Sequence, residues 1–356
     1  MDTGRTPGRH ITVDDVARRA GVSRATAARA LGGYGTVGAQ AKEKVLAAAA
    51  ALDYRPNELA RSMMTGRSGT IGVVVGDIEN AYFALAVRGI SDVAKAHGFN
   101  VILANTGENV ETEKAAIGVL VGKRVDGIIV TPAKLSDAAH LRHLQHSARP
   151  LVLLDRSIPG LDIDTVVLDD RSAAEEATRL LIEAGHRRIS YVSATVAADA
   201  LYRGPAAIDL STVLARIEGV TAACRKAGID DTERHIRLGV TDAPAAERIV
   251  AGLMAGPDRP TAILASDSLV GLNVFKALRS LRLSIPRDVS FICFHDADWT
   301  GVTSPPITVI DQPVYELGRQ AAEVVIRRIG GGGGPAARLV LPTRLIARAS
   351  VGAPSV

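Results

Sequence analysis

Short runs of Val, Ile and Leu alternate with amphipathic stretches over most of this 356-residue chain, starting at Thr70. The first runs are TIGVVVGD, FNVILAN, VDGIIVT and RPLVLLD, with helical patterns at about 82–97, 111–123 and 136–147. Apolar runs of this length are typical of buried parallel strands. Strands that alternate with helices predict an α/β fold of parallel sheets with helices on both faces.

A second series of strand-like runs follows the first: DTVVLDD, RRISYVS, RPTAILA and DVSFICF, with helices near 172–184, 213–227, 243–254 and 267–282. Two series predict two doubly wound lobes with a ligand cleft at the carboxyl ends of the strands. We expect the chain to cross between the lobes near residues 168, 299 and 328. Lobe 1 would then hold about 69–168 and 300–327, and lobe 2 about 169–299 and 328–356, so that the core spans 69–356.

Composition limits which residues can build this core and in which compartment the protein is expected. Aromatic residues make up only 3% of the chain while apolar residues make up 47%, so the core must be built from Ala, Val, Leu and Ile. Two cysteines, Cys224 and Cys293, are too few for a disulfide framework or a zinc finger, which fits a reducing compartment. Apolar runs stay far below the length of about 18 residues that a membrane span needs, and the N-terminus lacks a secretory pattern. We expect a cytoplasmic protein with no membrane partner.

The excess positive charge lies at the N-terminus. Residues 1–68 hold 11 Lys and Arg against 6 Asp and Glu, whereas the remainder holds 31 against 32. A basic head on a near-neutral body is the electrostatic pattern of a nucleic-acid-binding protein.

The head itself has the pattern of a helix-turn-helix. Thr12 can cap one helix, Gly21 permits a left-handed turn, and Ser23 can cap a second helix that ends at Leu31. A third helix is expected at about 40–52, and its Val45, Leu46, Ala49 and Leu52 would close a small core. We expect a disordered tail at 1–10, a DNA-binding domain at 11–56, and a hinge and linker at 57–68.

The second helix should present Arg24, Ala25 and Arg29 outward. An arginine can bind the O6 and N7 atoms of guanine together, and an alanine can contact the methyl group of thymine. The alternative is an ordinary helical bundle with a solvated arginine face.

Three segments carry a family resemblance: VDDVARRAGVSRAT, EKVLAAAAALDYRPN and ARSMMTGRSGTIG. They resemble the lac repressor (LacI/GalR) family of bacterial transcription regulators, and the resemblance extends over residues 11–350. It implies a hinge helix at 57–65 that enters the minor groove, with Met63 as an apolar wedge where the family usually has Leu. The alternative is that Met63 and Met64 are buried beneath the linker. The implied DNA contacts are Thr12, Ser23, Arg24, Ala25, Thr26, Arg29, Tyr54, Asn57, Ala60 and Met63.

The same resemblance implies a periplasmic-binding-protein-like core with a sugar-like ligand in its cleft. In that superfamily Asn80 would hydrogen-bond the ligand, and Tyr82 and Phe83 would stack on it. Asp155 and Arg156 match positions that bind sugar hydroxyls, which a carboxylate and a guanidinium can grip from opposite sides. The implied ligand-binding residues are Asp77, Asn80, Tyr82, Phe83, Asp155, Arg156, Asp169, Arg216, Ser266, Asp267, His295 and Gln312.

Two features depart from the family pattern. His295 stands where the family more often has Asp, so the ligand cannot be transferred from relatives; alternatively His295 turns away and Asp296 caps the next segment. The stretch at 194–210 is longer than the usual loop. It could form a lid over the cleft or a simple surface excursion.

Competing functions find little support in the chain. The glycine run at 33–38 follows a helix rather than a strand, so it does not fit a dinucleotide site. His140, His143 and His146 step around a helix by threes and cannot converge on one metal ion. We therefore expect no enzyme activity, no metal and no cofactor, and the basic head argues against a simple sugar receptor.

The prediction is a homodimeric repressor of a sugar or related catabolic operon, which binds a palindromic double-stranded DNA operator. A small effector in the cleft would control its operator affinity allosterically. A corepressor-dependent regulator that senses a nucleobase or another non-sugar metabolite would use the same parts.

Overall fold

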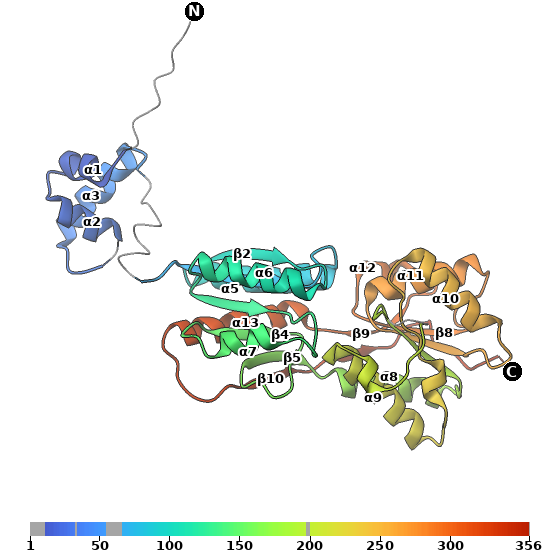
Figure 1. Ribbon diagram of the computed structural model, residues 1–356. Helices are drawn as coiled ribbons and strands as arrows, with labels where there is room; N and C mark the ends of the chain where they lie inside the picture. The colour runs from blue at the N-terminus through green and yellow to red at the C-terminus, as the bar shows by residue number, and fades with distance from the viewer. Residues whose placement is uncertain (1–10, 33, 55–65, 197–199, 356) are drawn as a thin grey trace, which may run out of the picture. The chain divides into compact units, whose positions relative to one another are not determined.

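The computed structural model describes residues 11–32, 34–54, 66–196 and 200–355 (Figure 1). The chain divides into two compact units, residues 1–70 with 124–126, and residues 71–123 with 127–356. The predicted tail at 1–10 and the predicted hinge helix at 57–65 lie outside the described residues.

In its described residues, the first unit contains three helices: α1 (Val13–Ala20), α2 (Arg24–Gly32) and α3 (Ala39–Ala51). The N–H and Oγ1 of Thr12 donate to the Asp15 carboxylate at 3.0 and 2.8 Å, and Ser23 Oγ accepts from the N–H of Thr26 at 3.1 Å. The helices α1 and α2 thus begin directly after their predicted caps, Thr12 and Ser23. Gly21, at φ 65°, forms the left-handed turn between α1 and α2. The predicted helix-turn-helix is confirmed.

The core of this unit is built from small side chains on all three helices: Val16, Ala17, Ala27, Ala30, Val45, Ala48 and Ala49. The prediction that Leu46 points inward was wrong, since 49% of this residue is exposed. The buried face of α3 runs through positions 45, 48 and 49, and the next residue along a helix is rotated by about 100° away from such a face.

The first sheet of the second unit has six strands in the order β10-β5-β4-β3-β1-β2. The pairings of β1 with β3, β3 with β4, β4 with β5 and β5 with β10 are parallel. α5 and α13 pack against each other and bury one face of this sheet. The strands are β1 (Thr70–Val75), β2 (Asn100–Asn105), β3 (Gly127–Val130), β4 (Leu151–Leu154), β5 (Asp164–Leu168) and β10 (Arg338–Leu341), and the helices are α5 (Ala81–Ala96), α6 (Val110–Gly122), α7 (Ala139–Gln145) and α13 (Val314–Ile329).

The second sheet has five strands in the order β11-β9-β8-β7-β6. Its pairs are parallel except that β11 runs antiparallel to β9. Separate apolar clusters cover its two faces. The strands are β6 (Ile189–Val192), β7 (Ala262–Ala265), β8 (Ser290–Phe294), β9 (Thr308–Asp311) and β11 (Arg344–Ile346), with the helices α8 (Asp170–Glu183), α9 (Ser211–Lys226), α10 (Ala243–Ala255), α11 (Ser268–Ser280) and α12 (Asp298–Val302) and the 3-10 turns η1 (Pro205–Ala207) and η2 (Thr232–His235).

The two-lobed, doubly wound α/β architecture is confirmed, but two of the three crossings lie elsewhere (Figure 1). The first joins β5 to α8 near the expected position 168. The second joins β9 to α13, at 312–313 rather than 299, because β9 still pairs with β8. The third joins β10 to β11, at 342–343 rather than 328, because β10 pairs with β5 of the first sheet.

One strand also changes series. The run DTVVLDD, expected to open the second series, forms β5 and pairs with β4, so it belongs to the first sheet. None of the helices in the described ranges combines the length and apolar character needed to span a bilayer.

Candidate functional site

The second helix of the head exposes the residues predicted to read bases. Arg24, Ala25 and Arg29 are exposed, with Arg24 Nε 3.4 Å from an Asp14 carboxylate oxygen and Arg29 Nε donating to the Ala25 carbonyl at 3.2 Å. Thr26 is half-buried beside the Ser23 cap, and Tyr54 packs against the head core. Asn57, Ala60 and Met63 lie outside the described residues.

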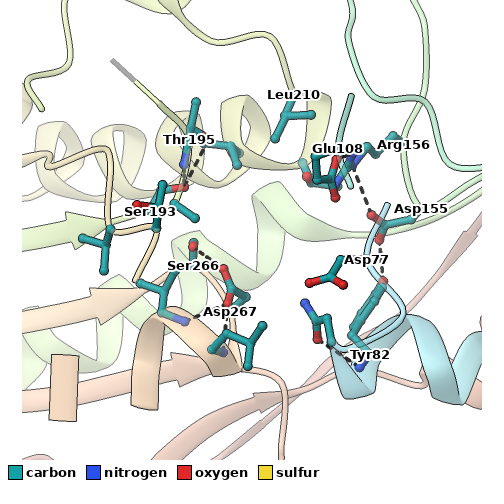
Figure 2. Close-up of a pocket in the computed structure, with 18 of the residues that line it drawn as sticks. Asp77, Tyr82, Glu108, Asp155, Arg156, Ser193, Thr195, Leu210, Ser266 and Asp267 are labelled. Carbon is teal, nitrogen blue, oxygen red and sulfur yellow. Dashed lines mark hydrogen bonds and ion pairs between the residues drawn. The ribbon is translucent and has the colours of Figure 1, made fainter. Parts of the chain in front are cut away.

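A cavity of about 770 Å³ lies between the two sheets of the core, and side chains from both lobes line it (Figure 2). Most of them follow the carboxyl ends of strands, as the sequence predicted. Eleven of the twelve predicted ligand-binding residues line the cavity: Asp77, Asn80, Tyr82, Phe83, Asp155, Arg156, Arg216, Ser266, Asp267, His295 and Gln312.

Asp169 is the exception among the predicted residues. The lining of the cavity does not include it, and its carboxylate accepts a hydrogen bond from the N–H of Thr343 at 2.9 Å. This bond joins the first crossing between the lobes to the third. The next residue, Asp170, instead binds Arg216, which lines the cavity.

The wall of the first lobe holds a buried tyrosine–carboxylate pair. The hydroxyl of Tyr82 donates to Asp155, and the Tyr82 ring meets Phe83 edge to face at 5.4 Å between centroids. Burial, reinforced by the negative charge of Asp155, raises the pKa of Tyr82 well above its ordinary value, so the hydroxyl remains a donor. Burial also raises the pKa of Asp155.

Arg156 lies beside this pair and is held by a residue that the sequence analysis missed. Its Nη1 and Nη2 donate to the two Glu108 carboxylate oxygens at 2.5 and 2.8 Å. Nη1 also donates to the Pro132 carbonyl at 3.0 Å, and Nε lies 3.7 Å from Asp155. Burial alone would lower the pKa of Arg156, but the Glu108 carboxylate outweighs it and raises the pKa.

The wall of the second lobe holds a different buried arginine. Arg216 Nε donates to Asp170 at 2.7 Å, its Nη1 donates to the Ser266 carbonyl at 2.5 Å, and its guanidinium lies 4.2 Å over the Phe294 ring. Gly219 allows this pairing, since a Cβ there would lie 2.3 Å from the Arg171 carbonyl. The absence of a side chain lets α9 approach the start of α8 closely enough for the ion pair to form.

Several polar residues at the cleft also cap helices. Asn80 Oδ1 accepts from the N–H of Tyr82 at 3.1 Å at the start of α5. Asp267 Oδ1 accepts from the N–H groups of Leu269 and Val270 at 2.9 Å each at the start of α11, while its second oxygen accepts from Ser266 Oγ at 2.8 Å. These caps fix the side chains in place, since each is tied to a helix N-terminus.

His295 follows β8 in a left-handed conformation at φ 72° and lines the cavity. Its ring meets Tyr82 of the other lobe edge to face at 5.7 Å. The alternative that His295 turns away was therefore wrong. Asp296 does contact the next segment, since it accepts from Thr300 Oγ1 on α12, and it also accepts from Arg348. Burial lowers the pKa of His295, which favours the neutral ring.

Three buried polar atoms of the cleft have no hydrogen-bond partner among the described residues: Arg156 Nε, His295 Nδ1 and Gln312 Nε2. Only 8% of His295 and 5% of Gln312 is exposed. Buried polar atoms are nearly always satisfied, so a ligand or water is the expected partner. The cleft thus combines aromatic faces, carboxylates, paired arginines and unsatisfied neutral groups, a chemistry suited to binding rather than to proton transfer.

The long segment at 194–210 borders the cavity at both described ends, 194–196 and 200–210. Asp209 bridges to the other lobe: its carboxylate accepts from the N–H and Oγ of Ser136 at 2.7 Å each, and its carbonyl accepts from the N–H of Leu135 at 2.9 Å. The sequence left open a lid or a surface excursion, and these bonds favour a strap across the cleft.

One of the histidines on α7, His140, makes a contact within the fold. His140 Nε2 lies 2.5 Å from Glu113, whose other carboxylate oxygen accepts from the N–H of Ala133 at 2.6 Å. Within the described part of the chain, no group of three or more His, Cys, Asp or Glu side chains is arranged to hold a metal ion.

Two family models match the chain. "Bacterial regulatory proteins, lacI family" matches residues 12–57, and "Periplasmic binding proteins and sugar binding domain of LacI family" matches residues 68–349. The HTH-type transcriptional regulator KdgR of Bacillus subtilis (strain 168) is 30% identical over 347 residues, which cover 96% of this chain and 98% of KdgR.

Solved structures agree with this relationship. The transcriptional regulator CelR in complex with cellobiose is 27% identical, with a TM-score of 0.69 over 96% of this chain and 99% of CelR. The lac repressor dimer bound to operator and the anti-inducer ONPF shares the fold, with a TM-score of 0.83 at 24% identity over 97% of this chain and all of that one. The chain belongs to the LacI family of bacterial regulatory proteins and is a DNA-binding transcription regulator rather than an enzyme.

Proposed function

We propose that the protein is a repressor of a sugar or related catabolic operon, whose operator affinity is controlled by a small ligand in the cleft between the lobes. The observation that carries this proposal is the cavity itself. It gathers the polar ends of strands from both sheets, in a chain that also carries a helix-turn-helix with an exposed arginine face. A ligand that contacts both walls changes how the lobes close on each other.

The ligand is an uncharged, sugar-like molecule in this proposal. Aromatic faces at Tyr82 and Phe83 suit the apolar side of a sugar ring, while Asp155 and the unsatisfied His295 and Gln312 suit its hydroxyls. The complex of CelR with cellobiose supports this class, since that relative binds a saccharide.

The DNA-binding form is a homodimer on a palindromic operator. One helix-turn-helix offers few base contacts, so two-fold related heads that read two half-sites supply the missing affinity and specificity. Arg24 and Arg29 would bind guanine edges and Ala25 a thymine methyl, while Met63 of the hinge would open the minor groove between the half-sites.

Selection of bound duplexes from a random DNA library tests the DNA-binding part. We expect a palindrome whose half-sites lie about one or more helical turns apart. Arg24→Ala should lose about 1–3 kcal/mol of discrimination at one base pair per half-site and leave the other positions unchanged. The exposed Arg18→Ala variant on α1 is the matched control. An Arg24→Ala protein that selects the wild-type sequence with equal stringency would remove Arg24 from base reading.

A further inference from the structure

Both arginines in the cleft walls are already paired within the protein. Arg156 gives both terminal nitrogens to Glu108, and Arg216 is bound by Asp170 and the Ser266 carbonyl. An arginine that recognises a phosphate or carboxylate on a ligand needs these same nitrogens in a free fork. Arg156 Nε lacks a hydrogen-bond partner, but a fork needs two free nitrogens, and neither of these two arginines has a free pair in the described part of the cleft.

Glu108 is held in this position by the backbone around it. The residue adopts a left-handed conformation at φ 59°, rare outside glycine, and its N–H donates to the Gly76 carbonyl at 3.2 Å. A Cβ on Gly76 would lie 2.1 Å from Glu108 Oε1, so the carboxylate lies against bare backbone at the end of β1. Two independent features, the turn and the missing side chain, aim this carboxylate at Arg156.

The rest of the lining adds negative charge. Asp77 and Asp155 face the cavity beside Tyr82, with Ser266 and Asp267 across from them (Figure 2). Besides Arg156 and Arg216, the described lining residues include one more basic side chain, Lys134, which is exposed. Carboxylates near a site of reduced dielectric repel a further anion, whereas they accept hydrogen bonds from uncharged hydroxyls.

We propose that Glu108 sets the charge selectivity of the cleft: by occupying Arg156 it excludes ligands that carry phosphate or carboxylate and admits uncharged polyhydroxylated ones. This inference rests on the proposed function in one respect, that the cleft is the effector site. It assigns to Glu108 a role in specificity, exerted through Arg156.

The test measures binding of glucose 6-phosphate and of inorganic phosphate to the full-length protein by calorimetry, at ionic strength matched with potassium chloride. The wild type should bind neither probe in the cleft. Glu108→Gln keeps the shape of the side chain but removes its negative charge and one of the two oxygens that accept from the Arg156 guanidinium. The variant should bind glucose 6-phosphate at least about tenfold more tightly than the wild type does, the effect of one charged hydrogen bond. Glu183→Gln, at an exposed carboxylate on α8, is the matched control and should behave as the wild type.

Two results would overturn the inference. One is tight binding of either anion by the wild type that is lost in Arg156→Met, because Glu108 would then fail to exclude anions. The other is a folded Glu108→Gln protein, checked by its circular dichroism and melting temperature, with no gain in anion binding. The proposed function fails differently: ligands would occupy the cleft of either protein without changing its affinity for operator DNA.

Discussion

The two walls of the cleft each bury an arginine beside a carboxylate, but they hold the pair in different ways. In the second lobe, Arg216 and Asp170 have side chains that are only 8% and 5% exposed, and Asp170 opens a helix. In the first lobe, Arg156 is equally buried, but its partner Glu108 is 38% exposed and lies in a turn after β2. Both members of the pair in the second lobe are buried, whereas the carboxylate of the pair in the first lobe faces solvent.

This difference in burial separates a charge pair that stabilises the fold from one that selects the ligand. A pair buried on both sides is costly to break, because the charge left behind has neither water nor a partner. A pair with one solvated member contributes less to stability. Its role can instead be to exclude anionic ligands from the cleft. We therefore expect substitutions in the second wall to affect folding and those in the first wall to affect ligand choice.

The largest effect is expected from Asp170→Ala. It leaves the Arg216 guanidinium buried without a counter-charge and should lower the free energy of unfolding by about 3–5 kcal/mol, measured by urea denaturation. Replacing both partners, Asp170→Leu with Arg216→Met, should recover much of that loss. If Asp170→Ala lowers the free energy of unfolding by less than about 1 kcal/mol, the pair in the second lobe does not stabilise the fold more than the pair in the first lobe. The same reasoning makes Arg216→Ala a poor test of ligand binding, because it strands Asp170.

Acid should weaken the second lobe. Burial lowers the pKa of His186, His235 and His295, all of which lie in this lobe. Their folded pKa values lie below the unfolded value of about 6.5, so stability is complete above that pH and falls as the pH decreases, by at most about 1.4 kcal/mol per pH unit for each histidine.

Melting temperatures recorded from about pH 7.5 to about pH 5, a range that spans the ordinary histidine pKa of about 6.5, would check this expectation. His186→Gln should flatten the pH dependence, because His186 is buried between Thr261 and Ser290. His143→Gln, at an exposed position of the first lobe, should leave it unchanged. If the melting temperature changes equally with pH in the wild type and in His186→Gln, His186 does not cause the loss of stability in acid.

A smaller effect on stability is expected for Glu108→Gln. The amide keeps one acceptor for Arg156, which also retains the Pro132 carbonyl and has Asp155 3.7 Å away, so the buried arginine is not left without partners. The variant should therefore lose about 1 kcal/mol or less, in contrast to Asp170→Ala. Urea denaturation under the same conditions compares the two walls directly. A loss as large as that of Asp170→Ala would make Glu108 a structural residue as well.

The smallest effect should be local. Asp209→Ala removes the carboxylate that accepts from the N–H and Oγ of Ser136, so the strap between the lobes loosens while the lobes stay folded. Hydrogen exchange should accelerate in the peptide that contains Leu135 and Ser136 and remain unchanged in β3. Asp230→Ala, on another loop of the second lobe, is the control. Unchanged exchange at Ser136 would mean that Asp209 does not hold the two lobes together.

The sequence predicted the elements and the edge of the sheets where the cleft lies, because apolar periodicity and the polar residues after strands are local signals. Asp77, Asp155 and Ser266 each follow a strand and could be found in this way. The crossings were misplaced because β9 and β10 are short strands whose sheets are decided by distant partners. Leu46 was misassigned because an alanine-rich helix gives little contrast between its faces.

The two charge pairs could not be predicted from pattern. Asp170 lies 46 residues from Arg216, and Asp169 beside it looks equally suitable until the start of α8 directs one inward. Glu108 is recognisable only through its left-handed backbone and the space left by Gly76. In sequence, the polar stretch TGEN after a predicted strand was the one available signal.

A ligand in the cleft should change the affinity of the protein for its operator. A melting-temperature screen of uncharged saccharides identifies a ligand, since one present at 100 times its dissociation constant adds about 2.7 kcal/mol of stability. Fluorescence anisotropy of the selected operator duplex is then titrated with full-length protein, with and without saturating saccharide. We expect the saccharide to change the operator Kd by about 5- to 150-fold. An operator Kd that stays the same while the cleft is saturated would contradict it.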